Sequence, residues 1–126
     1  MNMILAIALG GGLGSVSRHY TIAAAANLWG AAFPYGTLLV NVLGSFIIGA
    51  LMETLALKWQ VSQEMRAFLF TGFLGGFTTF SAFSLDVLKL AETDQFLPAL
   101  IYVFLSVGLS LAAIFLAVHL MRGVFA

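Results

Sequence analysis

Residues 36–52 read GTLLVNVLGSFIIGALM and contain no charged residue. The apolar run continues to Leu57, with Glu53 as its one charge. A helix that crosses the hydrocarbon core of a bilayer needs roughly 20 predominantly apolar residues, because each residue adds about 1.5 Å to its length. This stretch therefore predicts a membrane-spanning helix over residues 36–57.

The composition of the whole chain also indicates a membrane protein. Of its 126 residues, 62% are hydrophobic and 8% are charged. Soluble domains carry about a quarter charged residues, so the charges of this chain cannot cover a water-facing surface. The formal net charge of zero argues against nucleic-acid binding, and the absence of cysteine excludes disulfides. The two histidines are too far apart in the sequence to form a zinc motif.

Charged and turn-forming residues divide the chain into four stretches of spanning length, which we expect at about 4–26, 36–57, 65–90 and 96–121. The connections between them are too short to hold an extramembrane domain. We therefore predict an all-α membrane protein in which residues 1–126 form one four-span domain. The first apolar run lacks the basic segment that opens a secretory signal, so we expect it to be retained.

The third stretch contains a poor helix-forming segment at residues 75–79, GGFTT. Glycine and threonine disfavour helix, and here they fall at the expected middle of the bilayer. Non-helical backbone persists at that depth only where protein or a lined cavity satisfies its polar groups, and the freed carbonyls of broken transporter helices coordinate cations. We predict a broken third helix, with one half before Gly75 and the other half after Thr79, and we expect the break to use the backbone freedom of Gly75. The alternative is a continuous helix with a glycine-rich packing face.

Two phenylalanines and two serines follow the predicted break directly. Phe80 and Phe83 lie three residues apart and thus on one helix face, and Ser81 and Ser84 share the neighbouring face. Such an aromatic pair usually contacts lipid or the protein core. A phenyl ring also has a positive edge, so beside two hydroxyls and a helix break the rings are able to solvate a small anion without a charge.

Two other stretches carry polar side chains at helical spacing. Thr37, Asn41 and Ser45 recur every four residues in the second stretch, and Ser106 and Ser110 lie one turn apart in the fourth. An amide deep in an apolar span is costly unless it is hydrogen-bonded or faces water. Asn41 therefore either joins two helices or lines a polar route. The two serines are equally ambiguous, because a serine can bond back to the carbonyl four residues earlier.

The few charged residues inside the spans do not form a catalytic site. Arg18 is the one basic residue well inside an apolar run. It either extends to the membrane interface or supplies positive potential at the mouth of an anion path. Glu53 and Asp86 lie near span ends, where we expect them to be solvated or paired. No nucleophile, histidine and carboxylate occur together, so the polar stripes favour an ion pathway over an enzyme.

The spans also contain pairs of small residues separated by one turn: Gly10 and Gly14, Ser45 and Gly49, and Gly72 and Gly76. This spacing lets helices approach closely in lipid, either within one chain or between subunits. Because four spans make only a thin bundle, we expect a homo-oligomer.

Three segments stand out as a set: GGLGSVSR at residues 11–18, GTLLVNVLG at residues 36–44 and GFLGGFTTFSAFS at residues 72–84. Together and in this order they resemble the signature of the CrcB/Fluc family of fluoride channels. The resemblance extends over the whole chain, including its length and its four-span layout. One departure is Ala82, where relatives often carry threonine, so no hydroxyl is present at that position.

The resemblance implies a channel that lets fluoride leave the cell passively across the inner membrane and so reduces fluoride toxicity. It further implies an antiparallel, dual-topology homodimer with two pores and one structural sodium ion (Na+) at its centre. The family's sodium-binding backbone carbonyls correspond here to Gly75 and Thr78 of both subunits, and we expect Arg18 in the vestibule. The fluoride-pore residues implied by the resemblance are Asn41, Phe80, Phe83, Ser81, Ser84, Thr37, Ser106 and Ser110.

Two other functions compete with this interpretation. A small multidrug transporter also forms an antiparallel four-span dimer, but it uses a glutamate in its first span, and here that span has no acidic residue. A structural subunit of a larger membrane complex would account for the packing glycines but not for three polar stripes.

Dual insertion agrees with a weak bias of basic residues between the two sides of the membrane. An N-inside orientation would place on one side Lys58, Arg66 and Arg122, and on the other Arg18 and Lys89.

Overall fold

The computed structural model describes residues 2–125, most of which are helical. Helix α1 spans Met3–Trp29, α2 spans Tyr35–Leu57 and α6 spans Phe96–Phe125. Between α2 and α6 the chain forms four successive pieces, which are α3 (Gln63–Ala67), the π-helix η1 (Phe68–Leu74), α4 (Gly75–Phe77) and α5 (Phe80–Glu92). The all-α prediction is confirmed, and the helical stretches begin and end within a few residues of the predicted limits.

Three helical stretches of the described residues are long and apolar enough to cross a membrane: Tyr35–Leu57, Gln63–Glu92 and Phe96–Phe125. Helix α1 has 27 residues and is also long enough. Its glycines, together with Arg18 and His19, make it less apolar than the other three. Four helical stretches are therefore confirmed, whereas length and composition together support a membrane crossing for three of them.

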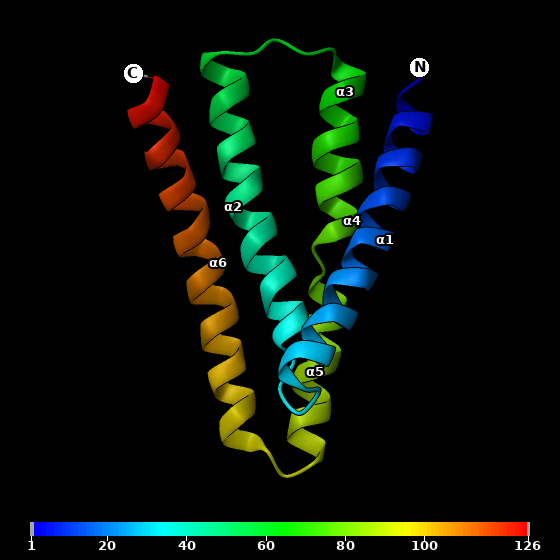
Figure 1. The fold of residues 1–126 in the computed structure, drawn as a ribbon, viewed down its shortest axis with the longest axis vertical. Coiled ribbons are helices and arrows are strands. Elements are labelled where there is room, and N and C mark those ends of the chain that lie inside the picture. Colours follow the sequence, from blue (N-terminus) through cyan, green and yellow to red (C-terminus); the bar gives the residue numbers. More distant parts are fainter. Residues whose placement is uncertain (1, 126) are drawn as a thin grey trace.

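The four stretches run alternately up and down (Figure 1). Both ends of the chain lie at the same end of the bundle as the α2–α3 connection, and the α1–α2 and α5–α6 connections lie at the other. Helix α2 packs along α6, whereas α1 packs against η1 and α4. The two pairs converge toward the end that holds α5, which we call the closed end, and they diverge toward the termini.

Glycines allow α1 and the third stretch to meet through their backbones. A Cβ atom on Gly72 would lie 3.0 Å from the Cα atom of Gly10, and Cβ atoms on Gly14 and Gly76 would lie still closer to backbone oxygens of the opposite helix. Gly49 has the same role between α2 and α6, because a Cβ atom there would lie 2.8 Å from a carbonyl oxygen of α6. All these contacts lie within one chain, so the small-residue pairs have a function in packing without a second subunit.

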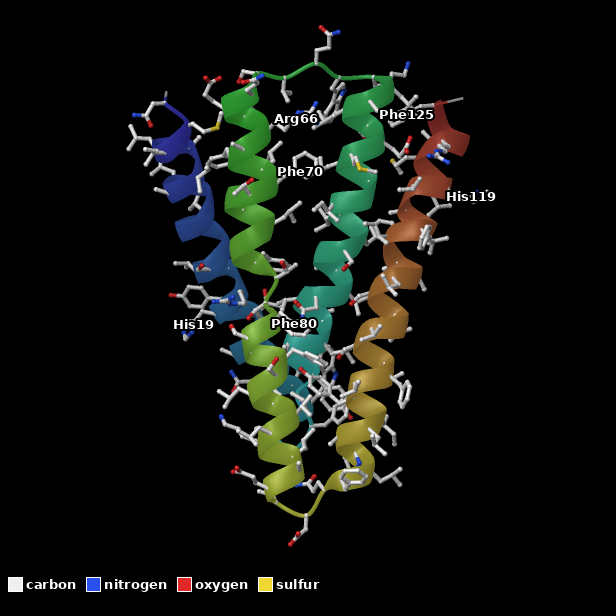
Figure 2. All side chains as sticks on the ribbon, turned by 180° about the vertical axis from the view of Figure 1, so that it is seen from behind. His19, Arg66, Phe70, Phe80, His119 and Phe125 are labelled. Atoms are coloured by element: carbon white, nitrogen blue, oxygen red, sulfur yellow. The ribbon has the colours of Figure 1, made fainter. Side chains whose placement is uncertain are left out.

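The π-helix η1 is an element that the sequence does not predict. π turns usually occur singly and often near functional sites. Here η1 runs for seven residues and leads directly into α4, where the Gly75 N–H donates to the carbonyls of Phe70 and Gly72. The side chain of Phe70 projects from η1 toward α2 (Figure 2). The widened helix therefore lies immediately before the segment predicted to be broken.

An ion pair connects α2 and α6 at the end that holds the termini. The Arg122 guanidinium donates to the Glu53 carboxylate at 3.0 Å, and the Glu53 side chain is only 10% exposed. Of the two alternatives expected for Glu53, solvated or paired, the structure thus shows the paired one. His19 and His119 project outward from opposite sides of the bundle (Figure 2), so they do not approach each other.

Candidate functional site

The helical backbone of the third stretch is interrupted at Thr78 and Thr79. Their φ and ψ angles are −88° and 157°, and −155° and 118°, which are extended rather than helical. The Thr78 hydroxyl donates to the Leu74 carbonyl at 2.8 Å, and the Thr79 hydroxyl accepts from the Ala82 N–H at 3.1 Å. The two threonine side chains thus satisfy backbone groups at the two helix ends that flank the interruption.

Asn41 of α2 holds this extended backbone in place. Its Oδ1 accepts from the Thr79 N–H at 2.8 Å, and its Nδ2 donates to the Thr79 carbonyl at 3.0 Å. Because the amide oxygen must face the N–H and the amide nitrogen must face the carbonyl, the two bonds determine the orientation of the side chain. The interpretation that Asn41 joins two helices is therefore confirmed. An amide nitrogen carries two N–H groups, so one is still available, and a role in a polar route stays a prediction.

The same contacts withdraw two backbone carbonyls from the helical ladder. In a continuous helix, the Thr79 N–H would donate to the Gly75 carbonyl. Likewise, the Ala82 N–H would donate to the Thr78 carbonyl. Here these N–H groups donate to the Asn41 side chain and to the Thr79 hydroxyl instead. The carbonyls of Gly75 and Thr78 thereby lose their helical donors and become available to other ligands.

Arg18 reaches the interruption from α1. Its Nη1 donates to the Thr78 carbonyl at 3.5 Å, and the residue is half-buried. At this distance the hydrogen bond is long and therefore weak, but it places a positive charge beside the extended backbone. The side chain is directed at the interruption and not along α1 to the membrane interface, so the snorkelling alternative is not what the structure shows.

A groove with a volume of about 440 Å³ lies beside the interruption. Its walls come from α2, η1, α4, α5 and α6, and the residues that line it are all uncharged. The groove brings together seven of the predicted site residues, which are Asn41, Gly75, Thr78, Phe80, Phe83, Ser106 and Ser110. Residues from three sequence-distant stretches therefore converge on one open cavity.

Phe80 and Phe83 form an adjacent but unequal pair. Their ring centroids lie 5.4 Å apart with the planes inclined by 47°. Phe80 is 77% exposed, whereas Phe83 is 9% exposed. Both rings line the groove, but only Phe83 is enclosed by the chain itself. The environment of Phe80 must be completed by lipid or by another molecule.

Ser106 and Ser110 place two hydroxyls in the wall that α6 contributes. Both oxygens are buried, and neither has a hydrogen-bond partner among residues 2–125. The alternative that these serines bond back to their own helix is therefore wrong. Leaving a buried hydroxyl without a partner costs about 1–3 kcal/mol, so this wall is suited to receive a further hydrogen-bond acceptor.

The other predicted hydroxyls do not line the groove. The Ser84 hydroxyl donates to the Phe80 carbonyl at 3.0 Å, and the Ser81 hydroxyl lies 3.3 Å from that of Thr79. Both serines are exposed. Thr37 is 5% exposed and lies one turn before the groove-lining part of α2. In the single chain, Thr37, Ser81 and Ser84 thus do not line the groove, although Ser81 and Ser84 contact two residues that do, Thr79 and Phe80.

The sequence does not by itself indicate that Tyr102 and Asp86 support the site. Tyr102 of α6 is fully buried, and its ring centroid lies 5.2 Å from that of Phe83. Its hydroxyl donates to Oδ2 of Asp86 at 3.0 Å, so this carboxylate, which we expected to be solvated or paired, has a neutral hydrogen-bond donor. One signal was present in the sequence, because Tyr102 continues the four-residue spacing of Ser106 and Ser110 by one turn.

Comparison with known proteins agrees with this architecture. Residues 5–118 match the family model described as CrcB-like protein, Camphor Resistance (CrcB). The fluoride-specific ion channel FluC of Rhizobium johnstonii is 50% identical over 122 residues, which cover 97% of this chain and 98% of that protein. The protein of the same name from Rhizobium etli is 52% identical, and the match covers 92% of this chain and 93% of that protein. The one from Chelativorans sp. is 50% identical, and the match covers 98% of this chain and 99% of that protein. The chain therefore belongs to the CrcB-like family, a family of ion channels and not of enzymes.

Proposed function

We propose that this chain forms a channel through which fluoride leaves the cell passively across the inner membrane, which limits fluoride toxicity. The names of the relatives indicate the ion. The observation that carries the proposal is the groove, which combines an amide, two unpartnered hydroxyls and two phenyl rings without any charged lining residue. Fluoride is small and holds its water tightly, so a narrow pore has to replace that water with donors and still release the ion.

The donors of the groove are neutral and of three kinds. The hydroxyls of Ser106 and Ser110 rotate freely to suit an acceptor, and the second N–H of Asn41 is not used by Thr79. The rings of Phe80 and Phe83 add positive edges. Fixed lysine or arginine side chains in the groove would bind larger anions as readily as they bind fluoride. Neutral donors therefore support selectivity for a small anion, while half-buried Arg18 raises the local anion concentration.

The working unit of this channel is, in our proposal, an antiparallel dual-topology homodimer. The groove of a single chain is open, and Phe80, one of its lining residues, is 77% exposed. A second copy would enclose the ion route and cover this ring. The weak bias of basic residues between the two sides supports insertion in both orientations.

The centre of the dimer is proposed to hold one sodium ion. The residues present fit such an ion, because the carbonyls of Gly75 and Thr78 have lost their helical donors. The Thr78 carbonyl also accepts the long bond from Arg18, and its second lone pair is the one left for a cation. Two copies would offer four neutral oxygens, and hard cations prefer oxygen ligands. When bound, the ion would offset the negative ends of carbonyl dipoles where two interruptions meet.

Fluoride efflux from liposomes, read with a fluoride electrode, tests the proposed ion. Purified protein is expected to empty liposomes loaded with fluoride and to leave chloride-loaded liposomes full. Absence of fluoride efflux would overturn the proposal, and equal release of chloride would remove the selectivity. Phe104→Leu is a suitable control, because Phe104 is 73% exposed on α6 and does not line the groove.

Orientation and sodium are tested separately. The native chain has no cysteine, so Gln60→Cys provides one label in the α2–α3 connection. Labelling from both sides of sealed vesicles is expected, and labelling from one side only contradicts dual topology. Replacing sodium by a bulky organic cation is expected to lower the thermal stability of the dimer, and unchanged stability would remove the structural ion.

A further inference from the structure

Six aromatic rings near the closed end form one continuous series. In order, they belong to Trp29, Tyr35, Phe33, Tyr102, Phe83 and Phe80, with centroid separations of 6.1, 4.9, 5.5, 5.2 and 5.4 Å. All five separations lie in the range of about 4.5–7 Å in which aromatic pairs attract each other. The series starts at the α1–α2 connection and ends in the groove, so it links a surface segment to the proposed pore.

Phe33 is the member that joins these two regions. It lies in the connection at residues 30–34 and precedes Pro34, which restricts its backbone to extended conformations. Its carbonyl accepts from the Tyr35 N–H at 2.8 Å. Its ring meets that of Tyr102 edge-on, with an angle of 87° between the planes. Phe33 is half-buried and packs against the buried cluster that contains Tyr102 and Phe83.

Tyr102 is restrained from three directions. Its hydroxyl is bonded to Asp86 at 3.0 Å, and its ring contacts Phe33 on one side and Phe83 on another. The residue is 0% exposed. Removing the Phe33 ring would leave space beside Tyr102 and release one of these restraints. Phe83 would then lose the fixed neighbour against which its own ring is inclined by 45°.

We propose that Phe33 is a positioning residue, which sets the orientation of the Phe83 ring through Tyr102 and thereby the rate of anion passage through the groove. The inference rests on the function proposed above. It follows from the charge distribution of a phenyl ring, whose edge attracts an anion and whose face repels it. A rotated Phe83 ring would therefore oppose the ion and not merely lose contact with it.

Fluoride efflux of Phe33→Leu tests the effect on transport. Leucine keeps an apolar side chain but removes the ring. The loss of the pair with Tyr102, the contact that the proposal uses, corresponds to a fall in flux of about two- to tenfold. Phe33→Tyr keeps the ring and is expected to retain the flux. Phe104→Leu is the matched control, because it removes an exposed ring of α6 that is outside the series. Native flux in Phe33→Leu would overturn the proposal.

A second measurement reports on the ring itself. Incorporation of 4-fluorophenylalanine at position 83 alone gives one ¹⁹F resonance, recorded in detergent without fluoride ion. Ring currents of Tyr102 make its frequency sensitive to the relative tilt of the two rings. Phe33→Leu is expected to shift or broaden this resonance, whereas Phe104→Leu and Phe33→Tyr should leave it near its native position. Gel filtration shows whether each variant keeps its native assembly.

The two measurements separate this inference from the proposed function. If the native protein released no fluoride, the proposed function would fail, and the resonance would still decide whether Phe33 orients Phe83. If Phe33→Leu kept the native resonance in an intact assembly, the positioning role would be wrong even with reduced flux. If the resonance moved while the flux stayed native, the link from ring orientation to transport would be wrong.

Discussion

Replacing Asn41 by leucine tests whether a single amide holds the interrupted backbone. Leucine has a similar size but neither donates nor accepts a hydrogen bond, so the variant removes both bonds to Thr79. Thr79 is 8% exposed, and Asn41 is half-buried. The extended N–H and carbonyl of Thr79 would therefore be left without partners from the protein.

The size of the effect follows from the number of hydrogen bonds lost, which is two. A buried backbone group that loses its partner costs about 1–3 kcal/mol, so two such groups give a loss of about 2–6 kcal/mol in the free energy of unfolding. Asn41→Asp keeps an acceptor for the Thr79 N–H but turns a second oxygen toward the Thr79 carbonyl. Its negative charge would also repel an anion strongly in a medium of low dielectric constant, so fluoride flux is expected to be lost in both variants.

Denaturation in detergent, followed by the fluorescence of Trp29 and Trp59, measures the loss of stability. Thr54→Val is the matched control, because Thr54 also lies on α2 and is 7% exposed. Its hydroxyl donates a hydrogen bond to the Ala50 carbonyl at 2.7 Å. That carbonyl keeps its helical N–H donor when the hydroxyl is removed. The control is therefore expected to lose about 1 kcal/mol or less.

The comparison between the two variants decides the outcome. An Asn41→Leu protein that is as stable as Thr54→Val would refute the conclusion that the amide supports the interruption. Normal flux in Asn41→Asp would count against a position of Asn41 beside the ion.

The neighbouring residues give three more expectations. A Cβ atom on Gly44 would collide with a threonine side chain of the interruption, whereas one on Gly75 would meet a single atom at 3.6 Å. Gly44→Ala should therefore reduce stability and flux more than Gly75→Ala, and the reverse order in denaturation and efflux would contradict the packing. Ser110→Ala removes a buried hydroxyl without a protein partner, so stability should be kept or rise by up to the about 1–3 kcal/mol that such a hydroxyl costs, while flux falls; native flux would exclude this serine from the ion route. Phe80→Ile and Phe83→Ile keep the bulk of the side chain but remove the ring edge, so fluoride efflux should fall while gel filtration shows native assembly. Unchanged efflux in either variant would exclude that ring from the ion route.

The limits of the helices were predictable because local features determine them. The predicted second stretch, 36–57, differs from α2 at Tyr35–Leu57 by one residue. Pro34 precedes this helix and Lys58 follows it, and the bilayer itself requires about 20 apolar residues between such positions. None of this depends on knowing which helices touch. The closed-end connection between α5 and α6 is equally local, since Asp94 adopts a positive φ of 59° there.

The construction of the interruption was less predictable because it depends on tertiary contacts. The sequence suggested that the chain uses the freedom of Gly75, but this residue has helical angles of −62° and −36°. That expectation is wrong, since the extended residues are Thr78 and Thr79. Their conformation requires the amide of Asn41 at the correct height on α2, and the close approach of Gly44 to Thr78 sets that height. No pattern within the third stretch contains this information.

Serines at helical spacing show the same limit. The sequence places Ser81 and Ser84, and also Ser106 and Ser110, on shared helix faces. In the structure, Ser84 bonds back to its own helix, while Ser106 and Ser110 have buried hydroxyls without partners among the described residues. Spacing determines the face of a helix but not the rotamer or the neighbouring helix. The hydroxyls that are available to an ion were therefore identified only from the packed chain.

The contacts of Asn41 connect the proposed anion route with the proposed cation site. This amide takes the Thr79 N–H away from the Gly75 carbonyl, and it also lines the groove. Any substitution of Asn41 therefore changes both the donors offered to fluoride and the carbonyls offered to sodium, so a loss of transport there has two possible causes. Ser110 contributes a side chain to the groove but no bond to the interruption. For this reason Ser110→Ala, which leaves the extended backbone intact, is the variant that isolates the anion route from the architecture that builds it.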